Sequence, residues 1–143
     1  MIDLSKLWNM RKIMPVVAVD SLSGKVLMLG YMNKEAFAYT LKTHRVWYCD
    51  SNGENVRMKG GHSGNTQKLI SIKADEDYYS LLVTVEQKGE VCQRDGGHST
   101  CFIHTIYGRE DIDFSKRKKF GRVEVDEDFD YSKEDYEDAY EDE

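Results

Sequence analysis

The sequence predicts a single α+β domain in which a strand-rich sheet is joined by one main helix. Short apolar runs rich in β-branched residues recur through residues 14–107, and among them only residues 33–43 have the 3.6-residue period of a helix. The chain length of 143 residues is enough for one domain with a sizeable core and too short for two ordinary ones.

The expected strands form mainly hairpins. The turn sequence Ser-Leu-Ser-Gly predicts a first hairpin between residues 14–20 and 25–32. A second hairpin is predicted across Asp-Ser-Asn-Gly, where Asn52 and Gly53 favour a primed turn. Its strands are residues 45–49 and 54–59, and three further strands are expected at residues 66–73, 80–87 and 99–107.

The expected main helix covers residues 33–43, with Asn33 placed as its N-cap. A short opening helix from Asp3 to about Met10 is compatible with the pattern. Four residues share one face of the main helix and are expected to be buried: Ala36, Phe37, Thr40 and Leu41.

The charge distribution divides the chain near residue 113. The net charge is −6, but residues 126–143 alone carry −10, which leaves +4 for residues 1–125. We therefore predict a domain at residues 1–113, and at residues 114–143 a basic segment followed by an acidic tail that we expect to be flexible. The basic cluster could bind nucleic acid or face the acidic tail; the second is favoured, so no nucleic-acid partner is expected. It consists of Lys116, Arg117, Lys118, Lys119 and Arg122.

Cysteine usage and the opening residues indicate the compartment. Three cysteines cannot all pair, and the chain is not a short cysteine-dense scaffold, so a reducing environment is expected. Residues 1–12 lack the basic-then-apolar order of a signal peptide, and no run approaches the roughly 18 apolar residues of a membrane span. We expect a soluble cytoplasmic protein with no membrane partner.

Residues 89–104 (GEVCQRDGGHSTCFIH) combine thiols and imidazoles around two glycines. Thiolate and imidazole together suit Zn²⁺. However, Cys92 and Cys101 are spaced more widely than in a zinc knuckle, so spacing alone gives a weak metal signal. In the alternative, Cys101 is an ordinary buried thiol in an apolar strand, and His98 and His104 are surface or core residues.

Two further polar segments could bind ligands. In an extended segment Asp75 and Asp77 would share one face, which suits Mg²⁺, while Glu76 would point to the other; alternatively the segment is an acidic turn. Residues 59–65 (KGGHSGN) could cradle phosphate through backbone N–H groups, Lys59 and Ser63, although the P-loop spacing is absent. A plain turn is the alternative.

The order of these segments is more specific than any one of them. The stretches GKVLMLGYMNKEAF, KGGHSGNTQKLISI, ADEDYYSLLVTVEQKGEVC and STCF resemble, in this order, the phosphoribosyl-AMP cyclohydrolase family of histidine biosynthesis. The resemblance runs from about Met14 to Tyr107, and it is most specific at VLMLGYMN and LLVTVEQ.

The resemblance implies a homodimer of strand-rich α+β subunits, with zinc sites formed between subunits. In the implied reaction, a zinc-activated water adds to C6 of the N1-substituted adenine ring of 1-(5-phosphoribosyl)-AMP, and the N1–C6 bond opens. Magnesium, held by an aspartate cluster, is implied to help bind the phosphorylated substrate.

Site roles follow from the resemblance position by position. Cys92 and Cys101 match two family zinc ligands, and Asp75 and Asp77 match the first two aspartates of the D-C-D-x-D magnesium cluster. Substrate contact is implied for the matching positions of the K-G-x-x-S-G loop, which are Lys59, Gly60, Ser63 and Gly64.

Several positions depart from the family pattern. Tyr79 stands at the third aspartate, and Glu76 stands at a zinc-binding cysteine. A carboxylate can bind zinc, so Glu76 is expected as the third ligand, with His98 as the alternative. The family's Cys-His pair reads Cys92-Gln93, and His98 is the candidate to replace the lost acid-base group.

A further departure changes the charge that the protein would present to the substrate phosphates. Where family members have W-S-R-S-R, this chain has Tyr48, Cys49, Asp50, Ser51 and Asn52. If the two arginines hold substrate phosphates, their exchange removes two favourable charges and adds a repulsive one. Cys49 is either a replacement ligand or a buried thiol, and the second is favoured.

Three functions remain open at this point. The first is zinc-dependent hydrolysis of 1-(5-phosphoribosyl)-AMP. The second is hydrolysis or deamination of another purine-like heterocycle by a diverged relative. The third is a non-catalytic ligand-binding or regulatory protein on the same fold.

Overall fold

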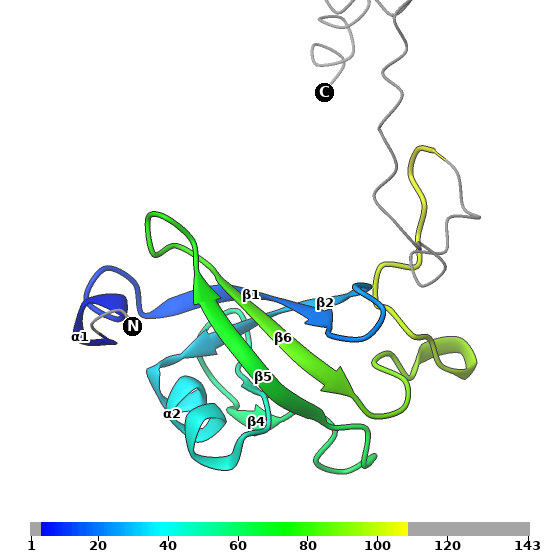
Figure 1. Ribbon diagram of the computed structural model, residues 1–143, viewed down its shortest axis with the longest axis horizontal. Helices are drawn as coiled ribbons and strands as arrows, with labels where there is room; N and C mark the ends of the chain where they lie inside the picture. Colours follow the sequence, from blue (N-terminus) through cyan, green and yellow to red (C-terminus); the bar gives the residue numbers. More distant parts are fainter. Residues whose placement is uncertain (1–3, 109–143) are drawn as a thin grey trace, which may run out of the picture.

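The computed structural model of the chain describes residues 4–108 (Figure 1). The predicted boundary at residue 113, the basic cluster and the acidic tail lie outside the described residues. The elements are α1 (Leu4–Leu7), β1 (Ile13–Asp20), β2 (Val26–Asn33), α2 (Lys34–Thr43), β3 (Trp47–Tyr48), β4 (Arg57–Met58), β5 (Gln67–Ala74), β6 (Leu81–Gln87) and a 3-10 turn (Arg94–Gly96). The predicted α+β class, rich in strands with one main helix, is confirmed.

Four strands form the main sheet in the order β2-β1-β6-β5. β1 is antiparallel to β2 and parallel to β6, while β5 and β6 form another antiparallel pair. β3 and β4 make a separate small hairpin, and it lies with α2 on one side of the sheet (Figure 1). The predicted first hairpin and the strands at 66–73 and 80–87 are confirmed within a residue.

The core lies between the sheet and α2. Alternate residues of β1 (Met14, Val16 and Ala18) are buried, as the two-residue period of a strand requires. β6 adds Leu81, Val83 and Val85 to the same cluster. Phe37 of α2 packs edge-to-face on Trp8, with ring centroids 5.4 Å apart. Each fully buried aliphatic side chain stabilises the fold by about 1.5–3 kcal/mol.

The N-cap prediction for α2 is confirmed, because the side chain of Asn33 accepts a 2.8 Å hydrogen bond from the Ala36 N–H. The predicted buried face is correct for Ala36, Phe37 and Thr40. It is wrong for Leu41, which is 41% exposed. Leu41 lies at the rim of a shallow groove between α1 and α2 rather than against the sheet. The opening helix is shorter than expected and covers only Leu4–Leu7.

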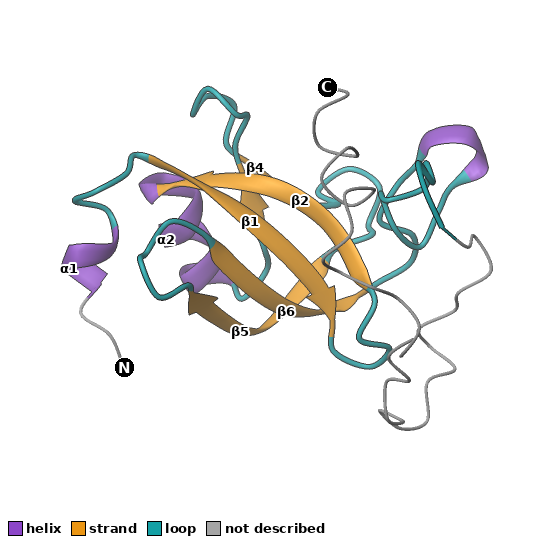
Figure 2. Cartoon of the chain, turned by 90° about the horizontal axis from the view of Figure 1, so that it is seen from above, coloured by secondary structure: helices purple, strands orange, loops and turns teal. Residues whose placement is uncertain are grey.

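The other side of the sheet carries a partly exposed row of apolar side chains. Leu29 of β2, Val17 of β1 and Leu82 of β6 stand opposite one another in one row across three strands. Leu29 and Leu82 are 47% and 39% exposed. Seen from above, no helix within residues 4–108 covers this row (Figure 2).

The second hairpin exists, but its turn differs from the prediction. The Gly53 N–H donates to the carbonyl of Asp50, so Ser51 and Asn52 are the central residues of the turn, and neither has a positive φ. Gly53 follows with φ 83°. This is a type I turn with a glycine bulge, which makes a three-residue loop instead of a primed two-residue turn.

The strand predicted at residues 99–107 is absent from the structure. The Cys101 N–H donates to the Leu27 carbonyl (2.7 Å), and the Thr100 hydroxyl donates to the Val26 carbonyl (2.7 Å). Beyond this attachment to β2 the segment leaves the sheet, and Ile106 and Tyr107 are almost fully exposed. Its apolar pattern therefore has no partner strand within residues 4–108.

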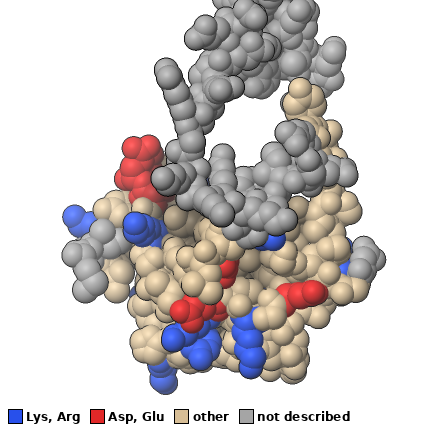
Figure 3. Space-filling model, turned by 45° about the vertical axis from the view of Figure 1, so that its right-hand side comes forward, with Lys and Arg blue, Asp and Glu red and all other residues tan. Residues whose placement is uncertain are grey.

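No helix among residues 4–108 is long and apolar enough to cross a membrane. On the face drawn in Figure 3, basic and acidic side chains lie side by side rather than in a continuous basic patch.

Candidate active site

The loop after β6 folds back on itself and carries thiols and an imidazole. Cys92 and His98 pair through both backbone bonds, at 3.1 and 2.7 Å. Directly opposite residues of an antiparallel pair project their side chains to the same side. The 3-10 turn at Arg94–Gly96 forms the tip, and Gly97 with φ 94° closes the return. Cys92 and His98 are thus neighbours in space despite five intervening residues.

Cys101 joins this pair. Partial burial raises the pKa of the Cys101 thiol, the adjacent Cys92 raises it further, and the nearby Lys59 ammonium opposes both effects. Both cysteines are free thiols. The alternative in which Cys101 is an ordinary buried thiol of a strand is wrong, because the residue as a whole is exposed where its segment leaves β2.

His98 adds an unsatisfied nitrogen to the two thiols. Its Nε2 atom is buried and has no hydrogen-bond partner among the described residues. A buried polar atom without a partner is costly and calls for an explanation. Within residues 4–108, however, no three Cys, His, Asp or Glu side chains of the single chain gather closely enough to hold a metal ion.

The segment considered for magnesium is the acidic turn given as the alternative, and not the extended segment in which Asp75 and Asp77 would share one face. Asp75 Oδ1 accepts from the Tyr79 N–H (2.7 Å) and Oδ2 accepts from the Ser80 hydroxyl (2.8 Å). These bonds, the one from Tyr79 first, hold the pKa of Asp75 below its ordinary value. Tyr78 takes the left-handed conformation with φ 59°. Asp75 therefore closes the β5–β6 connection.

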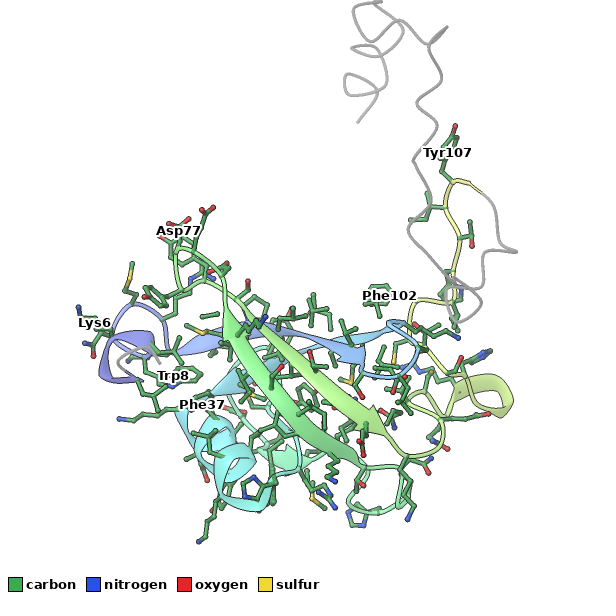
Figure 4. The ribbon with its side chains drawn as sticks, in the orientation of Figure 1. Lys6, Trp8, Phe37, Asp77, Phe102 and Tyr107 are labelled. Atoms are coloured by element: carbon green, nitrogen blue, oxygen red, sulfur yellow. The ribbon has the colours of Figure 1, made fainter. Side chains whose placement is uncertain are left out.

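The acidic turn and the thiols lie at opposite ends of the sheet. Figure 4 shows Asp77 at one end and Phe102, the neighbour of Cys101, at the other. The seven residues of β6 separate them, a length of about 23 Å. Glu76 of one chain therefore does not reach Cys92 and Cys101 of the same chain.

The glycine-rich loop is near the thiols. Its start is fixed by the Lys59 N–H, which donates to the Val46 carbonyl (3.0 Å). Gly60 has φ 75°, and a Cβ there would overlap the Asn65 carbonyl, so only glycine fits. Gly64 donates to the Gly60 carbonyl (2.9 Å). The N–H groups of Gly60, His62 and Ser63 make no hydrogen bond within residues 4–108, so they are free to meet an anion.

A pocket of about 410 Å³ lies between this loop and the inner side of β2. Sequence reasoning missed most of its walls. One signal was present: a glycine inside a strand often marks a close backbone approach. A Cβ at Gly30 would lie 2.6 Å from the Tyr48 ring, so glycine lets that ring pack on β2. The lining residues are Met28, Gly30, Tyr48, Cys49, Arg57, Met58, Lys59, Gly60, Gly61, His62 and Ser63.

A chain of buried and partly buried hydrogen bonds connects a wall of the pocket to the glycine loop. The Tyr48 hydroxyl donates to Gln67 Oε1 at 2.6 Å, and Gln67 Nε2 donates to Gln87 Oε1 at 3.0 Å. Gln87 Nε2 in turn donates to the Asn65 carbonyl of the glycine loop (3.3 Å). Burial, followed by the nearby Cys101, raises the pKa of Tyr48, so its hydroxyl stays protonated as a donor. A continuous chain of hydrogen bonds therefore links the pocket wall at Tyr48 to the glycine loop at Asn65.

Comparison with known proteins gives this arrangement a family. The phosphoribosyl-AMP cyclohydrolase family model matches residues 28–103. The phosphoribosyl-AMP cyclohydrolase of Clostridium botulinum is 42% identical over 94 residues, which cover 66% of this chain and 84% of the relative. The chain belongs to the phosphoribosyl-AMP cyclohydrolase family. Its members are hydrolases that act on a cyclic amidine, so the enzyme prediction is confirmed.

Two further relatives extend the comparison. The phosphoribosyl-AMP cyclohydrolase of Streptococcus mutans is 40% identical over 98 residues, 68% of this chain and 88% of the relative. The histidine biosynthesis bifunctional protein HisIE of Synechocystis is 42% identical over 103 residues, 72% of this chain. The chain spans only 47% of that bifunctional relative.

Proposed function

We propose that the chain hydrolyses 1-(5-phosphoribosyl)-AMP, opening the N1–C6 bond of its adenine ring, as a step of histidine biosynthesis in the cytoplasm. The observation that carries the proposal is the family match over residues 28–103, within which the loop at Lys59 lines a pocket of about 410 Å³. The three free cysteines are compatible with a reducing compartment.

The pocket walls match the two parts of such a substrate. Met28, Met58 and the Tyr48 ring offer polarisable and aromatic surface to a purine. On the other wall, Lys59 and the unpaired N–H groups of the glycine loop can receive a phosphate. The chain would thus hold the ring and fix its orientation by the phosphate.

The thiol pair suits zinc as a cofactor. Two adjacent thiols are donors that Zn²⁺ prefers, and a carboxylate such as that of Glu76 can complete the set. Cys92 and Cys101 would hold the ion as thiolates, so each must lose its proton on binding. When bound, zinc lowers the pKa of a water molecule at the site to about 7 and so supplies hydroxide at neutral pH.

His98 has the position of a proton-transfer group. Its backbone is fixed by the pairing with Cys92, and its Nε2 atom lacks a partner among the described residues. A histidine held this way can accept a proton from the attacking water and return it to N1 as the ring bond breaks. We assign this role to His98 and the third zinc ligand to Glu76.

A homodimer accounts for the distance between Glu76 and the thiols. The open row of Leu29, Val17 and Leu82 supplies an apolar surface for a second copy. A twofold axis that lies in this face at right angles to the strands turns the second copy end for end relative to the first and pairs the apolar row with itself. Glu76 of one subunit would then approach Cys92 and Cys101 of the other.

Shared sites predict rescue between two inactive variants. Glu76→Ala and Cys101→Ser chains, each inactive alone, are co-refolded in equal amounts. About half of the dimers are then mixed, and each mixed dimer regains one of its two sites, which gives about a quarter of wild-type activity. Turnover of the mixture measures this, and an inactive mixture of folded dimers would contradict shared sites. A chain mass of 16.6 kDa in the ultracentrifuge, rather than about twice that, would contradict the dimer itself.

Magnesium at Asp75 and Asp77 stays a prediction, and no step is derived from it. Both oxygens of Asp75 already accept hydrogen bonds within its turn, and Tyr79 replaces the third family aspartate.

Complementation tests the proposed function in a cell. A bacterial strain that lacks its own cyclohydrolase requires histidine, and expression of this chain is expected to remove the requirement. The Cys101→Ser variant, expressed at the same level, is the matched negative control. Continued histidine dependence with well-expressed, folded wild-type protein would favour a different heterocyclic substrate.

A further inference from the structure

The rim of the pocket carries an ion pair that the family pattern does not predict. Arg57 of β4 lines the pocket, and its Nη2 lies 3.2 Å from Oδ1 of Asp50, across the β3–β4 hairpin. An exposed pair of this kind adds little to fold stability. The consequence of this ion pair is therefore positional, because Asp50 holds the Arg57 guanidinium at the rim of the pocket.

Asp50 is rigidly placed. Its N–H donates to the Glu54 carbonyl (2.8 Å), and its own carbonyl accepts from Gly53 (2.9 Å), so it begins the bulged turn. Oδ2 accepts a 2.6 Å hydrogen bond from the Asn55 side chain. Asn55 adopts a left-handed conformation with φ 54°, which asparagine tolerates better than most residues. One carboxylate oxygen is thus committed to Asn55 and the other faces Arg57.

Arg57 keeps most of its donors free. A guanidinium has five N–H donors, and only the bond to Asp50 is formed within residues 4–108. Its side chain is 74% exposed. A cation held by one edge, with its other edge open, is arranged to bind a second anion.

The pocket has a clear charge bias. Arg57 and Lys59 both line it, and no carboxylate is among its lining residues in the described part of the chain. The repulsive charge expected from Asp50 is therefore offset by Arg57. The positive charge missing from position 50 is supplied from position 57, on the facing strand of the same hairpin.

We propose that Arg57 binds a phosphate of the substrate, and that Asp50 is the positioning residue that orients it. This inference rests on the proposed function. Arg57 and Lys59 would receive the anion from two walls of the pocket, while the purine lies against the methionines and Tyr48.

Kinetics test the phosphate contact. Arg57→Ala is expected to raise KM for 1-(5-phosphoribosyl)-AMP about tenfold while kcat changes less than about threefold, because the contact is equally strong in substrate and transition state. Arg57→Lys is expected to recover part of the loss. Lys42→Ala, which removes an exposed cation of α2 outside the pocket, is the matched control and keeps the wild-type KM. An unchanged KM in folded Arg57→Ala would overturn the inference.

Direct binding separates this inference from the proposed function. Calorimetry compares AMP with adenosine and ribose 5-phosphate with ribose, so each pair differs by one phosphate. Wild type is expected to prefer the phosphorylated member of at least one pair, and Arg57→Ala to lose that preference. If wild type binds with this preference but does not turn over 1-(5-phosphoribosyl)-AMP, the function fails and the phosphate site stands. If Arg57→Ala keeps the preference, or wild type has none, the phosphate site fails.

The role of Asp50 is tested by the direction in which its removal changes KM, with and without Arg57. In the wild-type background, Asp50→Ala is expected to raise KM about threefold, because the guanidinium loses its orientation. In the Arg57→Ala background the same change is expected to lower KM, because it removes an unpaired carboxylate that repels the phosphate. Effects of the same sign in both backgrounds would contradict the positioning role.

Discussion

Replacing Cys101 with serine is expected to reduce bound zinc from about one ion per chain to almost none. The same change should lower kcat/KM for 1-(5-phosphoribosyl)-AMP by about a thousandfold or more, which corresponds to about 4 kcal/mol of transition-state stabilisation. The cause is that a serine hydroxyl does not ionise to a metal ligand under conditions where the thiol does. Elemental analysis and steady-state kinetics on the same preparation measure both effects.

The fold should survive this substitution, so the loss can be read as a site effect. Cys101 is exposed, and its attachment to Leu27 is made by the backbone N–H. Cys49→Ala is the matched control for zinc content. Cys49 is buried, burial raises the pKa of its thiol, and it should not contribute to zinc binding. Zinc retained by Cys101→Ser and lost by Cys49→Ala would reverse the assignment.

His98→Ala should separate proton transfer from metal binding. We expect the variant to keep its zinc while kcat falls about 10²- to 10⁴-fold, the usual contribution of a general acid or base. The physical basis is the unpartnered Nε2 atom beside Cys92. Zinc analysis together with kcat on one preparation is the measurement.

The other outcomes for His98 are equally informative. Loss of zinc together with activity would make His98 the third ligand and remove that role from Glu76. Unchanged kcat with zinc retained would exclude His98 from the reaction. His104→Ala is the matched control, because His104 is exposed on the segment that has left the sheet.

Hydrophobic periodicity predicted correctly the helix and strands that bury one face against the core. Buried residues alternate with less buried ones in β1 and β6, and Asn33 caps the start of α2, so local pattern and tertiary burial agree. Residues 99–107 have a similar apolar pattern but find only the short attachment at Leu27. A strand needs a partner, and sequence alone does not reveal whether a sheet edge is available.

The candidate site residues were predictable from the sequence where residue type alone indicates their chemistry. They were much less predictable where a role depends on the distance between side chains in the folded chain. The thiols, His98 and the glycine loop were identified in advance, although their metal and substrate roles stay predictions. For Asp75 the sequence left an extended segment and a turn open, and the turn is formed because the carboxylate accepts hydrogen bonds from the Tyr79 N–H and the Ser80 hydroxyl. Arg57 was missed because its significance depends on a pairing across a hairpin that only the folded chain makes.

The most direct test of the central claim is turnover of 1-(5-phosphoribosyl)-AMP by the purified wild-type chain, before and after zinc is removed with a chelator. The proposed function predicts ring opening by the zinc-loaded protein, loss of activity in the chelated protein and recovery when zinc is returned. Zinc-loaded, folded protein that leaves 1-(5-phosphoribosyl)-AMP intact, or equal turnover with and without zinc, would contradict it.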